Sequence, residues 1–482
     1  MESVDATSRR SNGERRESGV VVNPCKACAP LGATLALKGV ARSMCLLHGS
    51  QGCATYIRRY LIGHFREPVD VASSSFDEST AVFGGRRNLL AGVENVIRKY
   101  DPEVIGIATT CLAETIGEDI GLYKNELPGR ETVEYVWAET AAYKGSHVDG
   151  FMRMTESLAK LAVGEEHVDD SLAASPSPPL RLNLFPWMVS PADLRFLKRI
   201  LIAAGIEATL LPDYSTTLDG GLWSDYEPIP PGGTPLAAIR AMGRADHSIV
   251  FGELAAERCN PAKTIYDRCA VPYSVLPLPI GLANSDRFLE RLAQLGARAT
   301  REGNGRREVI LPQDLRDARA RLMDAYADAH KYFAGMTAAV YGEGDFVVAM
   351  AGFLSEVGIH PSICLTSDPG SRLLTWSVRE AMRRSAGAGT EPTIAADADF
   401  SRLDALLEEH RPDVLVGNSK GYKSARAHGI PLVRAGFPIQ DRFGGQRLLH
   451  LGYEGALRMT DELANVVIAG RQDASPVGYM SM

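Results

Sequence analysis

The sequence predicts an α/β protein built from three doubly wound, Rossmann-like domains with parallel sheets. At 482 residues the chain is too long for one core, since domains of about 150 residues are typical. Val104–Ala108 is a short apolar run after Asp101-Pro102, as expected for a buried parallel strand. A strand–helix–strand order then appears twice more along the chain, which indicates repeated βαβ units.

The first part of the chain is expected to contain a tail and one cysteine-rich domain. Residues 1–20 are polar, include several acidic side chains and lack an apolar signal segment, which predicts a disordered tail. Residues 21–180 hold three conspicuous cysteine motifs and should form a cluster-binding α/β domain. Its end is the Pro/Ser-rich stretch 171–180, which reads as a linker.

Two further α/β domains are expected at 181–335 and 336–482. Arg181–Phe185 should be a strand, the helix after it should begin with Ser190 as N-cap and Pro191, and 206–211 should be the next strand. The second copy of this order runs through strand 338–341, helix 344–357 and strand 363–365. A long helix, 313–333, should join the two domains, and the other elements expected are strand 413–418 and a final helix at 454–470.

Composition narrows the classes of protein that this chain can be. It carries 52 basic and 59 acidic residues and a net charge of −7, so it lacks the excess of positive charge that is typical of proteins that bind nucleic acid. No apolar run is long enough to span a membrane. Eight cysteines without a secretory signal indicate a reducing compartment, where thiols bind metal or stay buried. We therefore expect a cytoplasmic protein that acts without nucleic acid or membrane.

Three cysteines stand in turns marked by glycine or threonine. They are Cys28 before Pro30-Leu31-Gly32, Cys53 after Gly49-Ser50-Gln51-Gly52, and Cys111 after Thr109-Thr110. Thiolates are soft ligands that select iron–sulfur clusters, zinc or Cu(I), and glycine lets the backbone approach a bulky group. An ordinary four-cysteine cluster needs one thiolate more. Any cluster held here is therefore expected to take further ligands from a partner chain.

Other readings of the cysteines and histidines remain open at this point. A lone cysteine is commonly a small buried hydrophobe, and Cys45, Cys259, Cys269 and Cys364 are read in that way. Cys25 and Cys28 form a single C-x-x-C, a weak signal for redox chemistry or zinc. For His48 and His64 a core or solvated position is favoured, with His48 as a candidate hydrogen-bond donor near the cluster. Tyr56 should share a helical face with Cys53 and is read as packing.

No nucleotide site or hydrolytic motif is recognisable in the chain. Gly342-Glu343-Gly344 resembles a glycine-rich strand–helix turn but is not G-x-G-x-x-G, and a tight βα turn is favoured. Neither G-x-S-x-G nor H-E-x-x-H occurs. The chain offers no catalytic residues of its own.

The cysteine motifs and several glycine-rich segments resemble the β-type subunit of nitrogenase component 1. The resemblance covers about residues 21–470 and is carried by the cysteine motifs, His64-Phe65-Arg66-Glu67-Pro68, Ala81-Val82-Phe83-Gly84-Gly85, Gly145-Ser146-His147-Val148, Gly417-Asn418-Ser419, Gly436-Phe437-Pro438 and Gly452-Tyr453-Glu454-Gly455. It implies a three-domain α/β fold and a homologous α-type subunit, with an α2β2 heterotetramer as the assembly.

The resemblance also implies a cofactor and an electron donor. A P-cluster-type [8Fe-7S] centre, or a related iron–sulfur cluster, would be shared with the α-type subunit, with Cys28, Cys53 and Cys111 as the ligands from this side. An ATP-dependent iron protein would supply electrons. The catalytic cofactor would lie in the α-type subunit, so no ligand for it is expected here.

Departures from the family pattern bear on the reaction. Ala142 stands where a serine of the molybdenum enzyme's β-subunit can ligate the oxidised cluster. Segments such as Arg434–Ile439 look closer to cofactor-assembly scaffold subunits, which commonly lack the second and third cysteines kept here. This combination of features resembles a nitrogenase-like reductase. Among these enzymes, the prediction that we prefer is a methylthio-alkane reductase, which reduces C–S bonds. A dinitrogen-reducing subunit, a non-catalytic assembly scaffold and a small-molecule-binding protein with merely buried cysteines are the alternatives.

Overall fold

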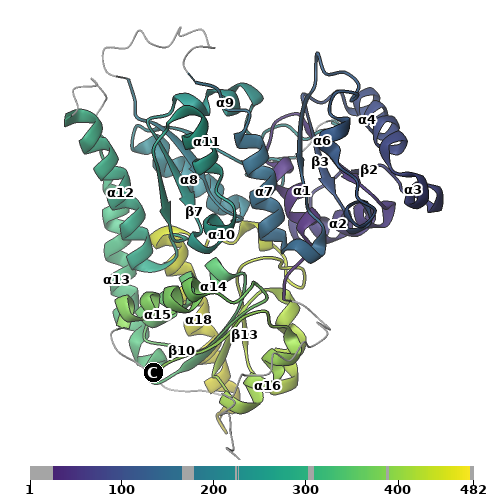
Figure 1. The fold of residues 1–482 in the computed structure, drawn as a ribbon. Coiled ribbons are helices and arrows are strands. Elements are labelled where there is room, and N and C mark those ends of the chain that lie inside the picture. The colour runs from purple at the N-terminus through teal and green to yellow at the C-terminus, as the bar shows by residue number, and fades with distance from the viewer. Residues whose placement is uncertain are drawn as a thin grey trace, which may run out of the picture.

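The computed structural model describes residues 25–164, 178–222, 225, 227–301, 309–386 and 390–477. Within these ranges the chain forms three parallel sheets, each covered by helices, and the α/β class expected from the sequence is confirmed (Figure 1). The tail expected at 1–20 and most of the linker at 171–180 lie outside the described residues. No helix in the described ranges has both the length and the apolar character needed to cross a membrane.

The first sheet has strand order β2-β1-β3-β4, with every pair parallel. β1 and β3 are fully buried, and they pair in register from Ser43 with Val104 to His48 with Thr109. The apolar run after Asp101-Pro102 is thus a central strand, as predicted. The elements are α1 (Ala29–Lys38), β1 (Ser43–His48), α2 (Gln51–Phe65), β2 (Ala72–Ser73), α3 (Glu78–Phe83), α4 (Arg86–Tyr100), β3 (Val104–Thr109), α5 (Cys111–Thr115), α6 (Ile120–Tyr123), β4 (Glu134–Ala138) and α7 (His147–Ala159).

The second sheet repeats the same arrangement, in the order β6-β5-β7-β8. Its first helix begins where the sequence predicts, because Ser190 caps α8 by accepting a hydrogen bond from the Asp193 N–H and Pro191 follows at the first helical position. The elements are β5 (Arg181–Phe185), α8 (Pro191–Ala203), β6 (Glu207–Leu210), α9 (Leu236–Ala241), β7 (His247–Phe251), α10 (Glu253–Arg258), α11 (Pro261–Cys269), β8 (Tyr273–Leu276) and α12 (Gly281–Arg301).

The third sheet has five strands in the order β11-β10-β9-β12-β13 and is again wholly parallel. The connecting helix α13 occupies the predicted range, and the last helix packs against α13 and α12. The elements are α13 (Gln313–Phe333), β9 (Thr337–Gly342), α14 (Gly344–Glu356), β10 (His360–Thr366), α15 (Arg372–Ala386), β11 (Thr393–Ala395), α16 (Phe400–His410), β12 (Val414–Gly417), α17 (Tyr422–His428), β13 (Leu432–Arg434) and α18 (Gly452–Ala474).

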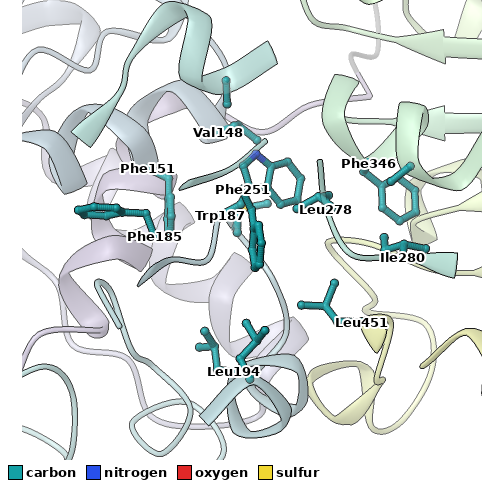
Figure 2. Packing of buried hydrophobic residues seen from close by; sticks show 14 of the residues in the cluster. Val148, Phe151, Phe185, Trp187, Leu194, Phe251, Leu278, Ile280, Phe346 and Leu451 are labelled. Carbon is teal, nitrogen blue, oxygen red and sulfur yellow. The ribbon is translucent and has the colours of Figure 1, made fainter. Parts of the chain in front are cut away.

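One hydrophobic core joins the three sheets where they meet. Figure 2 shows Phe151 from α7, Phe185 from β5 and Phe346 from α14 in the same cluster, and each of these side chains is nearly inaccessible to solvent. Burying such aromatic side chains stabilises a fold by about 1.5–3 kcal/mol each. The core therefore fixes the relative positions of the three parts of the chain.

Candidate functional site

The three cysteines of the sequence motifs all stand where a helix begins. Cys28 is the N-cap residue of α1, Cys53 is the third residue of α2, and Cys111 is the first residue of α5. α2 follows β1 and α5 follows β3, and these two strands are neighbours in the sheet. Carboxyl ends of adjacent parallel strands share one edge, which is where sites of open α/β sheets lie. Cys111 was expected at such a position, and it is there.

The three thiols lie close enough together for each to influence the ionisation of its neighbours. Burial raises the pKa of the Cys28 thiol, and the neighbouring Cys53 and Cys111 raise it further. Burial also raises the pKa of Cys53, with a second contribution from Cys111. All three residues are partly exposed, whereas Cys25, Cys45 and Cys364 are buried. The thiols thus form a cysteine triad, Cys28, Cys53 and Cys111, that opens at the protein surface.

The spacing of the triad bears on what it can bind. In the ranges that the structure describes, no three His, Cys, Asp or Glu side chains lie close enough together to hold a single metal ion. Cys25, the other half of the C-x-x-C, turns away to the third sheet, where it packs beside Tyr341 and its N–H donates to the Ser367 hydroxyl. Burial raises the pKa of Cys25 to about 12. The donor set on this chain is therefore three thiols, a set that fits an iron–sulfur group with further ligands from elsewhere.

A backbone N–H is aimed at the sulfur of Cys111. The donor is Ala142, at 3.2 Å from the Sγ atom. Its loop is held by Glu114, one turn beyond Cys111: the carboxylate accepts hydrogen bonds from the Thr109 hydroxyl at 2.5 Å and the Ala141 N–H at 2.8 Å, and Lys144 lies 2.6 Å from its other oxygen. Glu114 therefore acts as a support for the hydrogen bond to sulfur.

Cys28 is placed by close packing of α1 on α7. A Cβ atom on Gly32 would lie 1.7 Å from the carbonyl oxygen of His147, and one on Gly150 would lie 1.9 Å from that of Ala29. Only glycine allows this crossing. The contact places Cys28 in an isolated bridge with Ser146 at the start of α7. This explains the glycine after Cys28 in its motif.

His147 was not singled out as a functional residue from the sequence, yet it supports the triad. Its Nδ1 atom accepts a hydrogen bond from the Ala27 N–H at 3.2 Å, next to Cys28, and its Nε2 atom lies 3.0 Å from the Glu343 carboxylate. Both side chains are buried. Lys420 adds a bond from its ammonium group to the Lys26 carbonyl oxygen at 3.0 Å. The segment before Cys28 is thus tied to the third sheet.

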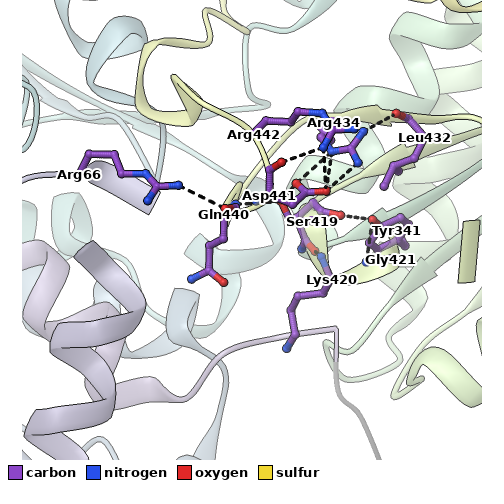
Figure 3. Close-up of polar contacts among 11 residues, drawn as sticks. Arg66, Tyr341, Ser419, Lys420, Gly421, Leu432, Arg434, Gln440, Asp441 and Arg442 are labelled. Atoms are coloured by element: carbon purple, nitrogen blue, oxygen red, sulfur yellow. Dashed lines mark hydrogen bonds and ion pairs between the residues drawn. The ribbon is translucent and has the colours of Figure 1, made fainter. Parts of the chain in front are cut away.

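Helix α2, which carries Cys53, is fixed to the third part of the chain at its far end. Arg66 donates to the Gln440 carbonyl oxygen at 3.3 Å, and the Gln440 amide donates to the Tyr60 carbonyl oxygen at 3.0 Å. Figure 3 shows Arg66 reaching Gln440 beside the ion pair of Arg434 with Asp441. These contacts define the direction of α2 and hence the position of Cys53.

Both flanking histidines, His48 and His64, are buried, which is one of the two positions expected from the sequence. His64 accepts a hydrogen bond from the Ile439 N–H at 2.9 Å, and burial lowers its pKa to about 3. His48 pairs with Ser74 and Glu118 rather than with a thiol. Ser50 serves as the N-cap of α2. The Gly342-Glu343-Gly344 segment is the tight βα turn expected, with Glu343 as N-cap of α14.

Large apolar side chains are exposed on the same sheet domain. Tyr56, expected to pack, is 73% exposed, while Leu112 and Tyr143 are exposed beside Cys111 and Ala142. At the end of α3, Val82 is 74% and Phe83 87% exposed. Val82 and Phe83 are adjacent in the chain, and adjoining exposed apolar side chains are candidates for a surface that binds another protein.

Comparisons with known proteins agree with this geometry. The nitrogenase component 1 type oxidoreductase family matches residues 28–468. The nitrogenase molybdenum-iron protein β chain of Clostridium pasteurianum is 32% identical over 93% of each chain, and that of Azotobacter vinelandii is 31% identical over 94% of this chain and 85% of the relative.

A solved structure, nitrogenase Cp1 at pH 6.5, superposes with a TM-score of 0.87 at 30% identity and covers 98% of both chains. A second chain, from nitrogenase Cp1 at pH 5, superposes with a TM-score of 0.65 at 16% identity, which shows a shared fold alone. The motif resemblance is thereby confirmed. This chain belongs to the nitrogenase component 1 type oxidoreductases and is β-like within that family.

Proposed function

We propose that this chain is the electron-relaying β-type subunit of a nitrogenase-like reductase. In this proposal Cys28, Cys53 and Cys111 provide half of the ligands of a P-cluster-type [8Fe-7S] centre, and a homologous α-type subunit provides the others. The observation that supports the proposal is that three partly exposed thiols, from three separate helix starts, lie close enough to affect one another's ionisation.

The residues around the triad suit thiolate ligation. Cys28 and Cys53 stand at the N-terminal ends of α1 and α2, where the helix dipole favours negative charge. The Ala142 N–H offers a hydrogen bond to the third sulfur. When bound, such a centre would supply storage and transfer of electrons at a potential that depends on hydrogen bonds to sulfur and on solvent exposure. This chain's part is to ligate, orient and tune.

A docking surface for an electron donor is available on the same domain. Val82 and Phe83 project from α3 with most of their surface exposed, and an unpartnered aromatic in such a position is a common anchor of protein interfaces. We infer that an ATP-dependent iron protein docks here and delivers electrons toward the triad.

For the substrate we favour the C–S bond of small thioethers. Cleavage of one such bond consumes two electrons and two protons and yields an alkane and a thiol. Ala142 supports a departure from molybdenum-type β-subunits, because its side chain has no oxygen to offer an oxidised cluster. Dinitrogen reduction is the second candidate, favoured by the names of the relatives at 31–34% identity. Retention of all three thiols disfavours a third candidate, an assembly scaffold.

The experiment uses the complex of this chain with its native α-type partner, purified without oxygen and supplied with iron protein and ATP. Dimethyl sulfide and dinitrogen are offered side by side. Methane with methanethiol, and little ammonia, is the expected result. Ammonia as the main product would make the complex a nitrogenase. Absence of any reduced product, with iron present, would support the scaffold role.

A further inference from the structure

A chain of buried and partly buried hydrogen bonds links the loop before Cys53 to the loop after Phe83. It begins at the Gly49 N–H, which donates to the Ser74 hydroxyl oxygen at 2.9 Å, and continues from Ser74 to His48 Nδ1 at 3.1 Å. His48 Nε2 lies 3.2 Å from one oxygen of the Glu118 carboxylate. The other carboxylate oxygen accepts the Gly85 N–H at 2.5 Å.

The protonation states along this chain are mutually consistent. Burial lowers the pKa of His48, and the favourable contacts with Glu118 offset only part of that effect. A neutral imidazole with its proton on Nε2 donates to Glu118 and accepts from the Ser74 hydroxyl, which in turn accepts from Gly49. Every donor then meets an acceptor, which is the condition for a rigid buried network.

Packing leaves the network little freedom. The His48 side chain is fully buried and that of Glu118 is 4% exposed. The ring of Phe76 meets the His48 ring edge-on, with centroids 4.8 Å apart. A Cβ atom on Gly85 would lie 2.2 Å from Phe76 Cζ and 2.9 Å from His48 Cε1, so the loop after Phe83 rests directly on both rings. A shift of this loop must therefore move His48.

The two ends of the network lie beside the two surfaces that the proposed function uses, the Phe83 surface and the cysteine triad. Gly85 follows the exposed Phe83 by two residues and caps α4. Gly49 precedes Ser50, the N-cap of the helix that carries Cys53, and the Cys53 N–H donates to the Ser50 carbonyl oxygen at 3.2 Å. Glu118 itself lies a few residues beyond the short helix that begins with Cys111.

We propose that the Glu118 carboxylate, by bonding His48 and the Gly85 N–H together, mechanically couples the Phe83 surface to the loop that positions Cys53. Glu118 is thus a positioning residue, which acts on the triad through His48 and Ser74. The identity of the protein on the Phe83 surface rests on the proposed function, whereas the coupling between the two loops does not. Coupling of this kind is a difference in free energy between two arrangements of the loops, and both sites can bias it.

The test is amide hydrogen exchange of the native complex in three variants. Glu118→Ala removes the bonds to His48 and Gly85 together with the Tyr123 contact, and Glu118→Gln keeps an acceptor for Gly85. Glu103→Ala is a control at the opposite end of the sheet, where the carboxylate pairs with Arg42. Loss of one buried hydrogen bond should speed local exchange about tenfold. In Glu118→Ala we expect this both at 83–88 and at 48–53, in Glu118→Gln mainly at 48–53, and in Glu103→Ala at neither.

Iron protein with an ATP analogue should slow exchange at both segments in the wild type and only at 83–88 in Glu118→Ala. Wild-type rates at 48–53 in Glu118→Ala would overturn the coupling. If the iron protein does not bind the wild-type complex, the proposed function fails, and the comparison of the free complexes still decides on the coupling. Iron content, measured on each variant, shows whether the triad remains loaded.

Discussion

The backbone N–H of Ala142 donates a hydrogen bond to the sulfur of Cys111 across 3.2 Å. The donor lies in the segment after β4, and the thiol belongs to the first residue of α5, which follows the adjacent strand β3. The side chain of Ala142 contributes no ligand, so the main chain alone supplies the polar contact at this corner of the triad. This relationship makes residue 142 the most direct place to tune the site.

Proline at position 142 should lower the reduction potential of a centre held by the triad. Ala142→Pro deletes the N–H, and donors to sulfur stabilise the more negative, reduced state. Ala141 has φ −54° and ψ 134°, a conformation that a following proline accepts, so the loop should survive. Ala142→Gly keeps the N–H and is the control. Redox titration followed by EPR measures both, and equal potentials would refute the role of the bond.

Serine at position 142 should add an oxygen ligand to the oxidised centre. Ala142→Ser places a hydroxyl beside Cys111, and the expected result is an EPR signal of the oxidised complex that differs from wild type while the dithionite-reduced signals coincide. Ala142→Val, similar in size but without oxygen, should leave the oxidised signal as in wild type. A serine-type signature already present in the wild type would contradict the reading of Ala142.

Removal of any one triad thiol should deplete iron. Cys28→Ala, Cys53→Ala and Cys111→Ala each leave two thiols on this side, so we expect iron per complex to fall by half or more. Cys269→Ala is the matched control, because Cys269 is also partly exposed but lies in α11 of the second sheet domain. Iron analysis after anaerobic purification measures this loss. Full iron content in all three variants would show that the triad does not ligate an iron–sulfur centre.

Glu114 should make the loop beside Cys111 sensitive to acid. Burial raises its pKa, but hydrogen bonds from Lys144, Thr109 and the Ala141 N–H outweigh burial and hold the pKa below the ordinary 4.5. Because the folded-state pKa is depressed, the stabilisation is present above pH 4.5 and is lost as the pH falls through the folded-state value.

Glu114→Gln should therefore cost about 1–3 kcal/mol of unfolding free energy at pH 7, since hydrogen bonds to a charged group are lost. The difference from wild type should shrink toward pH 3.5. Thermal unfolding of both proteins between these pH values measures it. A difference that does not change with pH would show that the carboxylate charge has no part in holding the loop.

Phe83→Ala should weaken binding of the iron protein about tenfold or more, as expected for truncation of an aromatic anchor. Ile202→Ala, at an equally apolar and exposed position in α8 of the second sheet domain, should leave affinity unchanged. The dissociation constant, measured with the ATP analogue present, distinguishes them. Equal affinity of Phe83→Ala and wild type would place the docking surface elsewhere.

Much of the architecture was readable from local pattern. The apolar run at 104–108 lies in β3, the range 313–333 is α13, and α8 begins at Pro191 with Ser190 as its N-cap. These elements were predictable because helix caps, apolar periodicity and strand length depend on residues that are neighbours in the sequence. The triad also followed from its motifs.

The supporting groups were harder to predict from the sequence. His147 meets Ala27 and Glu118 meets His48 across many intervening residues, so no local spacing encodes these contacts. Tyr56 was expected to pack and is exposed instead. Its helical spacing from Cys53 gives a face of α2 but does not say whether this chain covers that face. The sequence therefore predicts where the three cysteines of the triad lie better than it predicts the network that positions them.

The most direct test of the central claim is the iron and sulfide content of the complex with its α-type partner, measured together with its EPR spectrum after strictly anaerobic purification. We expect a brown complex whose iron exceeds what the partner retains when this chain carries Cys28→Ala, Cys53→Ala and Cys111→Ala together. A complex whose iron content is the same with and without the three thiols would contradict it.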